Sequence, residues 1–280
     1  MKVAVMTDST AYIPADIRKK HHIHMVPLNV VFEEASYREE IDITTEEFYQ
    51  KVKEAEGLPK TSQPSIGYIT SKLEELAKYY DAVVSIHLSS GISGTYEAVC
   101  SAREMVEGID VYTYDSELSC MGQGSYVLEA VEMVKEEKSP EEIIARFDEI
   151  KQSIRAYFMV DDLSNLQRGG RLNGAQALVG SILQVKPVLH FVDKVIVPFE
   201  KIRTRKKALS RISSLLEEDA SKAKAIKVVF IHANNEQVAI NLRDEFLEKY
   251  PSADTSIGYI GPVIGTHLGE GAVGITWYLK

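Results

Sequence analysis

Hydroxyl side chains are concentrated in the stretch HLSSGISGTY at residues 87–96, directly behind the apolar run at 82–86. A second cluster, TSQPS at residues 61–65, also precedes a segment of helical period. Ser and Thr before a helix usually cap it, and capping is the simpler interpretation of TSQPS taken alone. Residues 87–96 carry more hydroxyls than capping requires, so we expect some of them to bind a ligand.

The chemistry expected of these groups is the binding of a small anionic head group. In an open parallel sheet, ligands sit at the carboxyl ends of the strands, where residues 7–10, 89–95 and 115–119 fall. Ser93 and Gly94 are expected to open a helix, whose free N–H groups and positive dipole end favour an anion.

A serine acyl-hydrolase that uses Ser93 as nucleophile and His267 as base is the alternative. A nucleophile elbow needs G-x-S-x-G, whereas residues 91–95 read GISGT, with the second glycine one place early. This departure weakens the alternative and leaves it open. The sequence contains neither a Walker motif nor a well-placed G-x-G-x-x-G, so nucleotide binding has no direct support.

Histidines occur in two different settings. The run HHIH at 21–24 has no nearby cysteine or carboxylate cluster, so we expect no metal site there. His267 lies in GPVIGTHLGEGA at 261–272, where frequent glycines indicate close backbone approach or unusual dihedral angles around a polar ring. By itself the pattern does not decide between a ligand-binding histidine and a satisfied core histidine.

The dense basic run RTRKK at residues 203–207 is the other candidate surface. Positive charge at a helix N-terminus is mildly unfavourable, so the run needs a further reason. Docking of an acidic partner is one such reason, and a scaffold protein that only binds partners here is a third functional hypothesis.

Alternating apolar runs and helical segments must position these groups. Strands are expected at 2–7, 25–32, 82–88 and 109–114, and helices at 45–53, 68–79, 94–106, 124–135 and 140–154. This βαβα order, with strands that read as continuous apolar runs, predicts an N-terminal domain with a mainly parallel sheet flanked by helices.

A smaller C-terminal α/β domain with a mixed sheet is expected to follow. It would contain a strand at 156–160, a hairpin of 187–192 and 195–199, helices at 206–218 and 236–250, and strands at 226–232, 256–260 and 272–279. We place the two domains at residues 1–157 and 158–280.

Composition limits the classes of partner. The 280 residues are 45% hydrophobic, and 32 Lys and Arg against 41 Asp and Glu give a formal charge of −9, so nucleic acid is not expected as a partner. The chain shows neither a signal peptide pattern nor a run long enough to span a bilayer, and its two cysteines form no CxxC pair. We therefore expect a cytoplasmic protein without stable membrane insertion.

Seven stretches together resemble the DegV family, and most closely the FakB fatty-acid-binding subunits of bacterial fatty acid kinase. They are TDST at 7–10, TSQPS at 61–65, SSGISGTY at 89–96, NLQRGGRL at 165–172, KPVL at 186–189, RTRKKA at 203–208 and GPVIGTHLGEGA at 261–272. The resemblance runs from end to end. One departure is Glu270, where many relatives have proline.

The resemblance implies a carrier without catalysis of its own and without a cofactor, and a monomer. It would bind a long-chain fatty acid of the palmitate, stearate or oleate class between its two domains, and residues 165–180 look more like the relatives that take saturated chains. A separate ATP-dependent kinase subunit would phosphorylate the carboxyl group for phospholipid synthesis.

The resemblance also implies a role for particular residues. Thr61 and Ser93, with Ser62, Gly94 and His267 beside them, would bind the carboxyl group. Arg171 and His267 would support phosphoryl transfer, and the kinase would dock on Arg203, Arg205 and Lys206.

Overall fold

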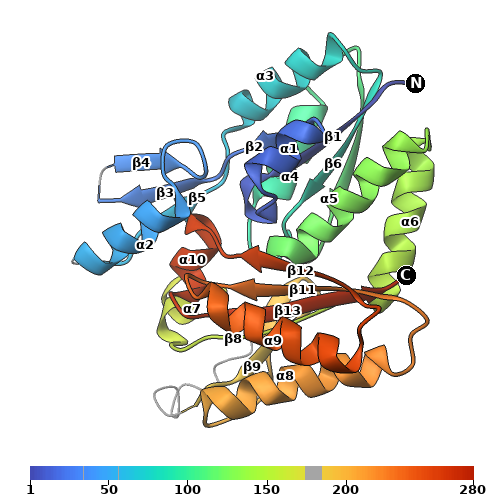
Figure 1. Ribbon diagram of the computed structural model, residues 1–280. Coiled ribbons are helices and arrows are strands. Elements are labelled where there is room, and N and C mark those ends of the chain that lie inside the picture. The colour runs from blue at the N-terminus through green and yellow to red at the C-terminus, as the bar shows by residue number, and fades with distance from the viewer. Residues whose placement is uncertain (34, 56, 174–184) are drawn as a thin grey trace.

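The computed structural model describes residues 1–33, 35–55, 57–173 and 185–280 (Figure 1). Within them the chain forms a four-stranded parallel sheet in its N-terminal half, a six-stranded mixed sheet in its C-terminal half and a small three-stranded antiparallel sheet. The predicted α/β fold class, with a parallel N-terminal and a mixed C-terminal sheet, is confirmed.

The N-terminal sheet has the order β2-β1-β6-β7, and every neighbouring pair is parallel. Its strands are β1 (Val3–Asp8), β2 (Ile23–Val26), β6 (Ala82–His87) and β7 (Asp110–Asp115). Helices α3 (Ile66–Ala77) and α4 (Thr95–Arg103) cover one face, and α5 (Cys120–Lys135) and α6 (Pro140–Ser153) cover the other. Burial on both faces explains why β1 and β6 read as unbroken apolar runs.

The single strand expected at 25–32 is wrong, because this segment forms two strands in different sheets. β2 ends at Val26, and β3 (Asn29–Phe32) pairs with β4 (Ala35–Arg38) and β5 (Lys60–Ser62). Pro27 lies between them and has no N–H to donate to a continued ladder. With α2 (Thr45–Glu54), this small sheet projects from one side of the molecule (Figure 1).

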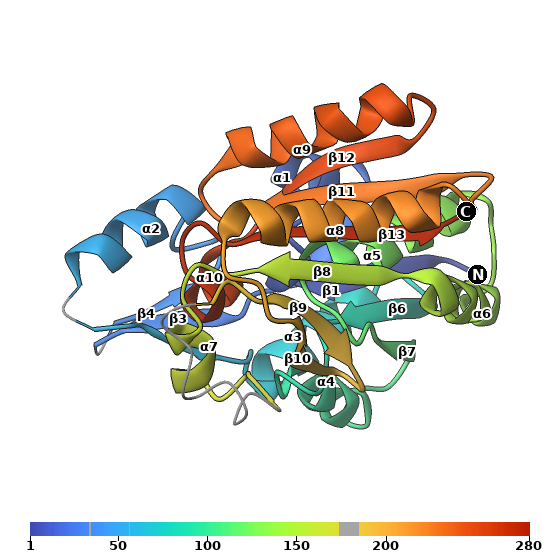
Figure 2. The ribbon, with the colours of Figure 1, turned by 90° about the horizontal axis from the view of Figure 1, so that it is seen from below.

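The C-terminal sheet has the order β10-β9-β8-β13-β11-β12. Its strands are β8 (Arg155–Met159), β9 (Val188–Val192), β10 (Val195–Glu200), β11 (Ile226–His232), β12 (Asp254–Tyr259) and β13 (Val273–Leu279). Helices α8 (Arg205–Ala220) and α9 (Glu236–Lys249) pack on its outer face (Figure 2). The inner face contributes Val229, Ile231 and Tyr278 to a core shared with α5 and α6.

The 3-10 turn η1 (Ser9–Ala11), α7 (Ser164–Arg168) and α10 (Pro262–Leu268) were not predicted. The short helix α1 (Ala15–Lys20) ends just before β2. The most important of these helices is α10, because it occupies part of the glycine-rich segment for which close backbone approach or unusual dihedral angles were expected, and Gly269 and Gly271 after it do have positive φ.

The division into domains at 1–157 and 158–280 stays a proposal. The expected boundary falls inside β8, whose residues from Arg155 onward pair with β13 in the C-terminal sheet. The helix α10 is late in the sequence but packs against β3, β5 and α2, which are early in it. The two halves therefore share a continuous core rather than meeting at a narrow contact.

Candidate functional site

A cavity of about 260 Å³ lies between the two halves of the chain. Leu28, Leu88, Ile92 and Cys120 line it from the N-terminal half, and the inner face of the C-terminal sheet lines it from the other side. Most of the lining is apolar.

Small residues on two paired strands open the apolar part of the cavity. Gly274 lies opposite Phe158 and Thr276 lies opposite Ala156 in the β13–β8 register, and all four line the cavity. A Cβ at Gly274 would come within 3.1 Å of the Phe158 Cβ. The lining extends from Gly274 to Thr276, at ~3.4 Å of rise per residue, so the cavity runs along β13.

Polar residues gather at the other end, and they include every predicted head-group residue. Thr61 and Ser62 come from β5, Ser93 and Gly94 from the loop before α4, and His267 from α10. Arg171, which follows α7, lines the same cavity. The structure thus brings together all six residues expected near the carboxyl group, although they are spread over some 200 positions of the sequence.

His267 is held in place on both sides of its ring. Its Nε2 lies 2.9 Å from the Thr61 Oγ1. On the other side, a Cβ at Gly169 would lie only 2.4 Å from the His267 Nδ1, so the ring requires glycine there. Burial, and to a smaller extent Arg171, lower the pKa of His267 to about 4. The imidazole is therefore neutral at neutral pH.

Ser93 and Gly94 lie at the start of α4, as expected. Gly94 is the N-cap, and the Ser93 Oγ lies 2.9 Å from the Thr95 Oγ1 and accepts a hydrogen bond of 3.3 Å from the Thr95 N–H. A Cβ at Gly94 would lie 2.2 Å from the Gln63 Oε1. Glycine therefore lets the segment after β5 approach the helix start, which places Thr61 and Ser93 at one cavity.

The geometry does not support the hydrolase alternative. Within the described residues, the hydrogen-bond partner of the Ser93 Oγ is Thr95 and that of the His267 Nε2 is Thr61. In the same part of the chain, no hydrogen bond or ion pair joins His267 to a carboxylate that could orient it. A nucleophile, base and orienting group are thus not assembled around Ser93.

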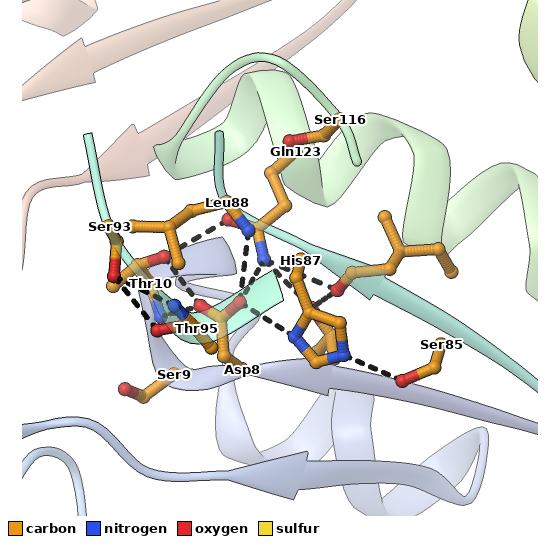
Figure 3. A network of polar contacts seen from close by, with 12 residues as sticks. Asp8, Ser9, Thr10, Ser85, His87, Leu88, Ser93, Thr95, Ser116 and Gln123 are labelled. Atoms are coloured by element: carbon orange, nitrogen blue, oxygen red, sulfur yellow. Dashed lines mark hydrogen bonds and ion pairs between the residues drawn. The ribbon is translucent and has the colours of Figure 1, made fainter. Parts of the chain in front are cut away.

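His87 belongs to a buried network behind the cavity rather than to its lining (Figure 3). Its Nδ1 lies 3.0 Å from the Asp8 Oδ2 and its Nε2 lies 2.6 Å from the Ser85 Oγ. The Asp8 carboxylate also accepts hydrogen bonds from the Leu88 N–H, from Thr10 and from the Gln123 side chain. All these side chains are fully buried, so the network fixes the strand ends and is not open to a ligand.

Ser89 and Ser90 connect the two halves of the chain. The Ser89 Oγ donates to the Lys194 carbonyl at 2.6 Å, and the Ser90 Oγ donates to the Asp115 Oδ2 at 2.6 Å. The Lys194 Nζ lies 2.9 Å from the same Asp115 oxygen. Lys194 is in the turn of the predicted β9–β10 hairpin, which the structure confirms. No local pattern in the sequence indicated that this turn docks beside Gly91.

The basic run at 203–207 lies at the start of α8 and outside the cavity lining. Arg203 and Lys206 are exposed. Arg205 is partly buried, and its Nη1 donates to the Asp161 Oδ2 at 2.6 Å and to the Gly271 carbonyl at 2.8 Å. Arg205 therefore ties α8 to the segment after α10.

Three further observations bear on the sequence predictions. Glu270 accepts a hydrogen bond from the Asn234 amide at 2.7 Å and pairs with Lys53 at 3.0 Å, so this departure from the family pattern is anchored by polar contacts. Of the segment 165–180 that suggested a saturated chain, residues 174–180 lie outside the described residues. None of the described helices is long and apolar enough to cross a membrane.

Known proteins resemble this chain over its whole length. Protein DegV of Bacillus subtilis (strain 168) is 58% identical over 281 residues, covering 100% of both chains. The crystal structure of DegV, described as a fatty acid binding protein from Bacillus subtilis, superposes with a TM-score of 0.95 and full coverage of both chains at 58% identity. A DegV family protein from Thermus thermophilus, whose structure is described by its fatty acid binding, has a TM-score of 0.94, 32% identity and full coverage of both chains.

A third structure names its ligand. It is a stearic acid-binding protein from Eubacterium ventriosum, with 26% identity, a TM-score of 0.88 and coverage of 99% of this chain and 98% of that one. The family model described as "Uncharacterised protein, DegV family" matches residues 2–280. By this match and by its full-length relatives, the chain belongs to the DegV family.

Proposed function

We propose that this chain is a cytoplasmic carrier that binds one long-chain fatty acid in the cavity between its two halves. The observation that carries the proposal is the cavity itself, whose lining is mostly apolar and in which Thr61, Ser93, His267 and Arg171 lie together. Its volume of about 260 Å³ is near the lower end of the ~300–1,000 Å³ of ligand sites, which suits a single slender chain. The fatty acid binding described for the relatives supports this assignment.

The tail supplies most of the affinity in this proposal. Burying about fourteen methylenes at ~0.8 kcal/mol each gives on the order of 11 kcal/mol before ordering costs are subtracted. The head group then only has to replace the hydrogen bonds that it loses to water. Thr61 and Ser93 donate to the carboxylate, with Ser62 and the N-terminus of α4 at Gly94 beside them.

Neutral His267 and cationic Arg171 have different roles in the proposal. The neutral imidazole has one N–H, and from Nε2 it can donate to the Thr61 Oγ1, which leaves the Thr61 hydroxyl proton for the carboxylate and forms no ion pair with it. Arg171 is held by a hydrogen bond of 3.2 Å from its Nε to the Ile92 carbonyl, which leaves other guanidinium donors for an anion. We propose that Arg171 and His267 stabilise charge during phosphoryl transfer to the bound carboxyl group.

The carrier performs no chemistry alone in this proposal, in the manner of the FakB subunits that it resembles. A separate ATP-dependent kinase subunit docks on the start of α8 and phosphorylates the presented carboxyl group for phospholipid synthesis. Exposed Arg203 and Lys206 provide the charge for docking, whereas Arg205 is already paired with Asp161.

Fatty acid binding is tested with delipidated protein and palmitate or oleate. Stoichiometric uptake by calorimetry, weakened in Thr61→Val and Ser93→Ala, is expected, and mass spectrometry of the purified protein should find an acyl chain. Failure of both acids to bind, with no lipid after expression, would refute the carrier. Ester hydrolysis by the pure protein that disappears in Ser93→Ala would instead support the hydrolase alternative.

Kinase presentation is tested with the double variant Arg203→Glu/Lys206→Glu. We expect slower acyl phosphate formation with a kinase subunit and an unchanged palmitate affinity, because both residues lie outside the cavity lining. The matched control, Lys222→Glu/Lys224→Glu, reverses two charges just beyond the other end of α8 and should leave the rate unchanged. Equal loss of palmitate affinity in the test variant would count against this docking surface.

A further inference from the structure

The start of α10 lacks the usual means of satisfying its backbone N–H groups. Its N-cap is Gly261, which has no side chain, and its first residue is Pro262, which has no N–H. The Val263 and Ile264 amides are therefore the first donors that need a partner. Both residues are buried, at 3% and 6% exposure, so water cannot serve as a partner without entering the core.

Two side chains more than 220 positions away supply the missing acceptors. The Glu39 Oε1 accepts a hydrogen bond of 2.7 Å from the Val263 N–H, and the Tyr12 hydroxyl accepts one of 3.0 Å from the Ile264 N–H. The same hydroxyl donates to the Glu39 Oε1 at 2.9 Å, so the two acceptors fix each other. A Cβ at Gly261 would lie 2.4 Å from the Tyr12 ring, so glycine is what lets the tyrosine approach.

Glu39 is held from its other side as well. Its Oε2 accepts from the Ser9 hydroxyl at 2.5 Å, and its backbone N–H donates to the Leu28 carbonyl at 2.8 Å. The residue is fully buried, and burial raises the pKa of its carboxyl to about 8. Among the described residues no ion pair joins Glu39 to a cation, because Arg38, its neighbour in sequence, pairs with Asp42 and Arg18 pairs with Glu40. Burying a carboxyl group without a cation in contact is costly, so we infer that the fold needs its oxygens as hydrogen-bond acceptors.

These acceptors matter because α10 carries His267. Its second residue is Val263 and its sixth is His267, which is about one turn further along the same side of the helix. Gly265 lies between them and packs closely on Tyr49, whose hydroxyl a Cβ there would approach to 2.8 Å. A helix of two turns moves as one body, so a displacement at its start is transmitted to the His267 ring.

We propose that Glu39 and Tyr12 are positioning residues, which act as a cap supplied from the other half of the chain and thereby set His267 against Thr61 at the cavity. The effect on ligand binding rests on the proposed function, whereas the effect on His267 does not. Sequence reasoning gave Glu39 no role, because its partners lie in a segment remote from it.

The test is a set of Glu39 variants whose His267 ring is titrated by NMR in ligand-free protein. Glu39→Ala removes the acceptor, so α10 should loosen and the pKa of His267 should rise by about one unit or more from about 4. Palmitate affinity should fall about tenfold. Glu39→Gln keeps an oxygen for Val263 and places an amide donor next to Ser9, so both quantities should stay near those of the wild type.

A control separates positioning from loss of stability. Val228→Ala creates a cavity in the cluster beneath α8 and α9, away from α10, and should lower Tm without moving the His267 titration or the palmitate affinity. Should Glu39→Ala fail to fold, Tyr12→Phe removes one acceptor and leaves the ring, and it should shift the His267 pKa in the same direction.

An unchanged His267 titration in every folded variant among Glu39→Ala and Tyr12→Phe would overturn the proposal. An equal shift in Val228→Ala would do the same, because it would show a general consequence of instability. If wild-type protein binds no palmitate, the proposed function falls, and the titration still decides whether Glu39 and Tyr12 position His267.

Discussion

The close contact between the two halves at Gly91 predicts a large effect of Gly91→Ala. A Cβ at this position would lie 2.4 Å from the Lys194 carbonyl oxygen, 2.7 Å from its carbon and 2.8 Å from the Lys194 Cβ. Gly91 does not have a positive φ, so its own backbone accepts alanine. The opposing turn is stiff, because Asp193 and Lys194 both have positive φ, as in a two-residue hairpin turn. The hairpin must therefore move as a unit.

The size of the effect follows from the contacts that this movement breaks. Restoring a normal separation requires roughly 1 Å, which would break the Ser89–Lys194 hydrogen bond, now 2.6 Å long. That bond contributes ~0.5–1.5 kcal/mol, and the half-exposed Lys194–Asp115 ion pair at most about 1 kcal/mol. Phe191 and Ile196 line the cavity and move with the hairpin. A loss of about 1–2 kcal/mol corresponds to binding that is five- to thirtyfold weaker.

The assay measures palmitate affinity by calorimetry and its release by stopped-flow exchange into vesicles. Gly91→Ala should release the ligand faster, because the hairpin that closes the cavity is displaced. Gly67→Ala is the matched control, since nothing lies within 4 Å of a Cβ at this position in α3. Wild-type affinity together with a wild-type release rate in Gly91→Ala would show that the hairpin contact has no part in holding the ligand.

Two more changes concern the polar end of the cavity, and a third concerns the buried carboxyl behind it. Gly169→Ala should push the His267 ring towards Thr61 and weaken palmitate binding about tenfold, measured against Gly67→Ala. Because the pKa of His267 is lowered from 6.5 to about 4 in the folded state, the contribution of His267 to stability should be lost as pH falls from 6.5 to 4. Urea titrations should show a smaller loss for His267→Gln. The pKa of Glu39 is raised from 4.5 to about 8, so its contribution to stability should be lost as pH rises through this range and that slope should vanish in Glu39→Gln.

Much of the fold was predictable because its strands are buried on both faces. β1 and β6 are continuous apolar runs, and the helices expected at 45–53 and 140–154 are α2 and α6, which begin at capping boxes on Thr44 and Ser139. These signals are local, so one sequence shows them. The residues predicted for the head group line one cavity, because strand ends and helix starts are where the chain can expose hydroxyls, and their role in binding stays a prediction.

The rest could not be predicted because its causes are tertiary. Pro262 and Gly269 are suited to the two ends of α10, but the glycine and β-branched residues between them are weak helix formers, and the first N–H groups are capped from across the fold by Glu39 and Tyr12. The docking of Lys194 beside Gly91 likewise leaves no local pattern. In TSQPS, the residue that caps α3 is Ser65, whose hydroxyl accepts a hydrogen bond from the Tyr68 N–H. Thr61 instead lies in β5 and lines the cavity.

The excess of hydroxyls at residues 87–96 was expected to bind a ligand, but most of these hydroxyls hold the loop in place. Of the hydroxyl residues in this stretch, Ser93 lines the cavity, whereas Ser89, Ser90 and Thr95 make contacts that hold the loop. A neutral hydroxyl binds an anion weakly unless its position is fixed beforehand, because it has no net charge to attract the ligand. One binding hydroxyl at the end of a strand therefore requires several supporting ones. A cluster of hydroxyl residues in a sequence thus indicates a preorganised site, and the number of hydroxyls is not the number of ligand contacts.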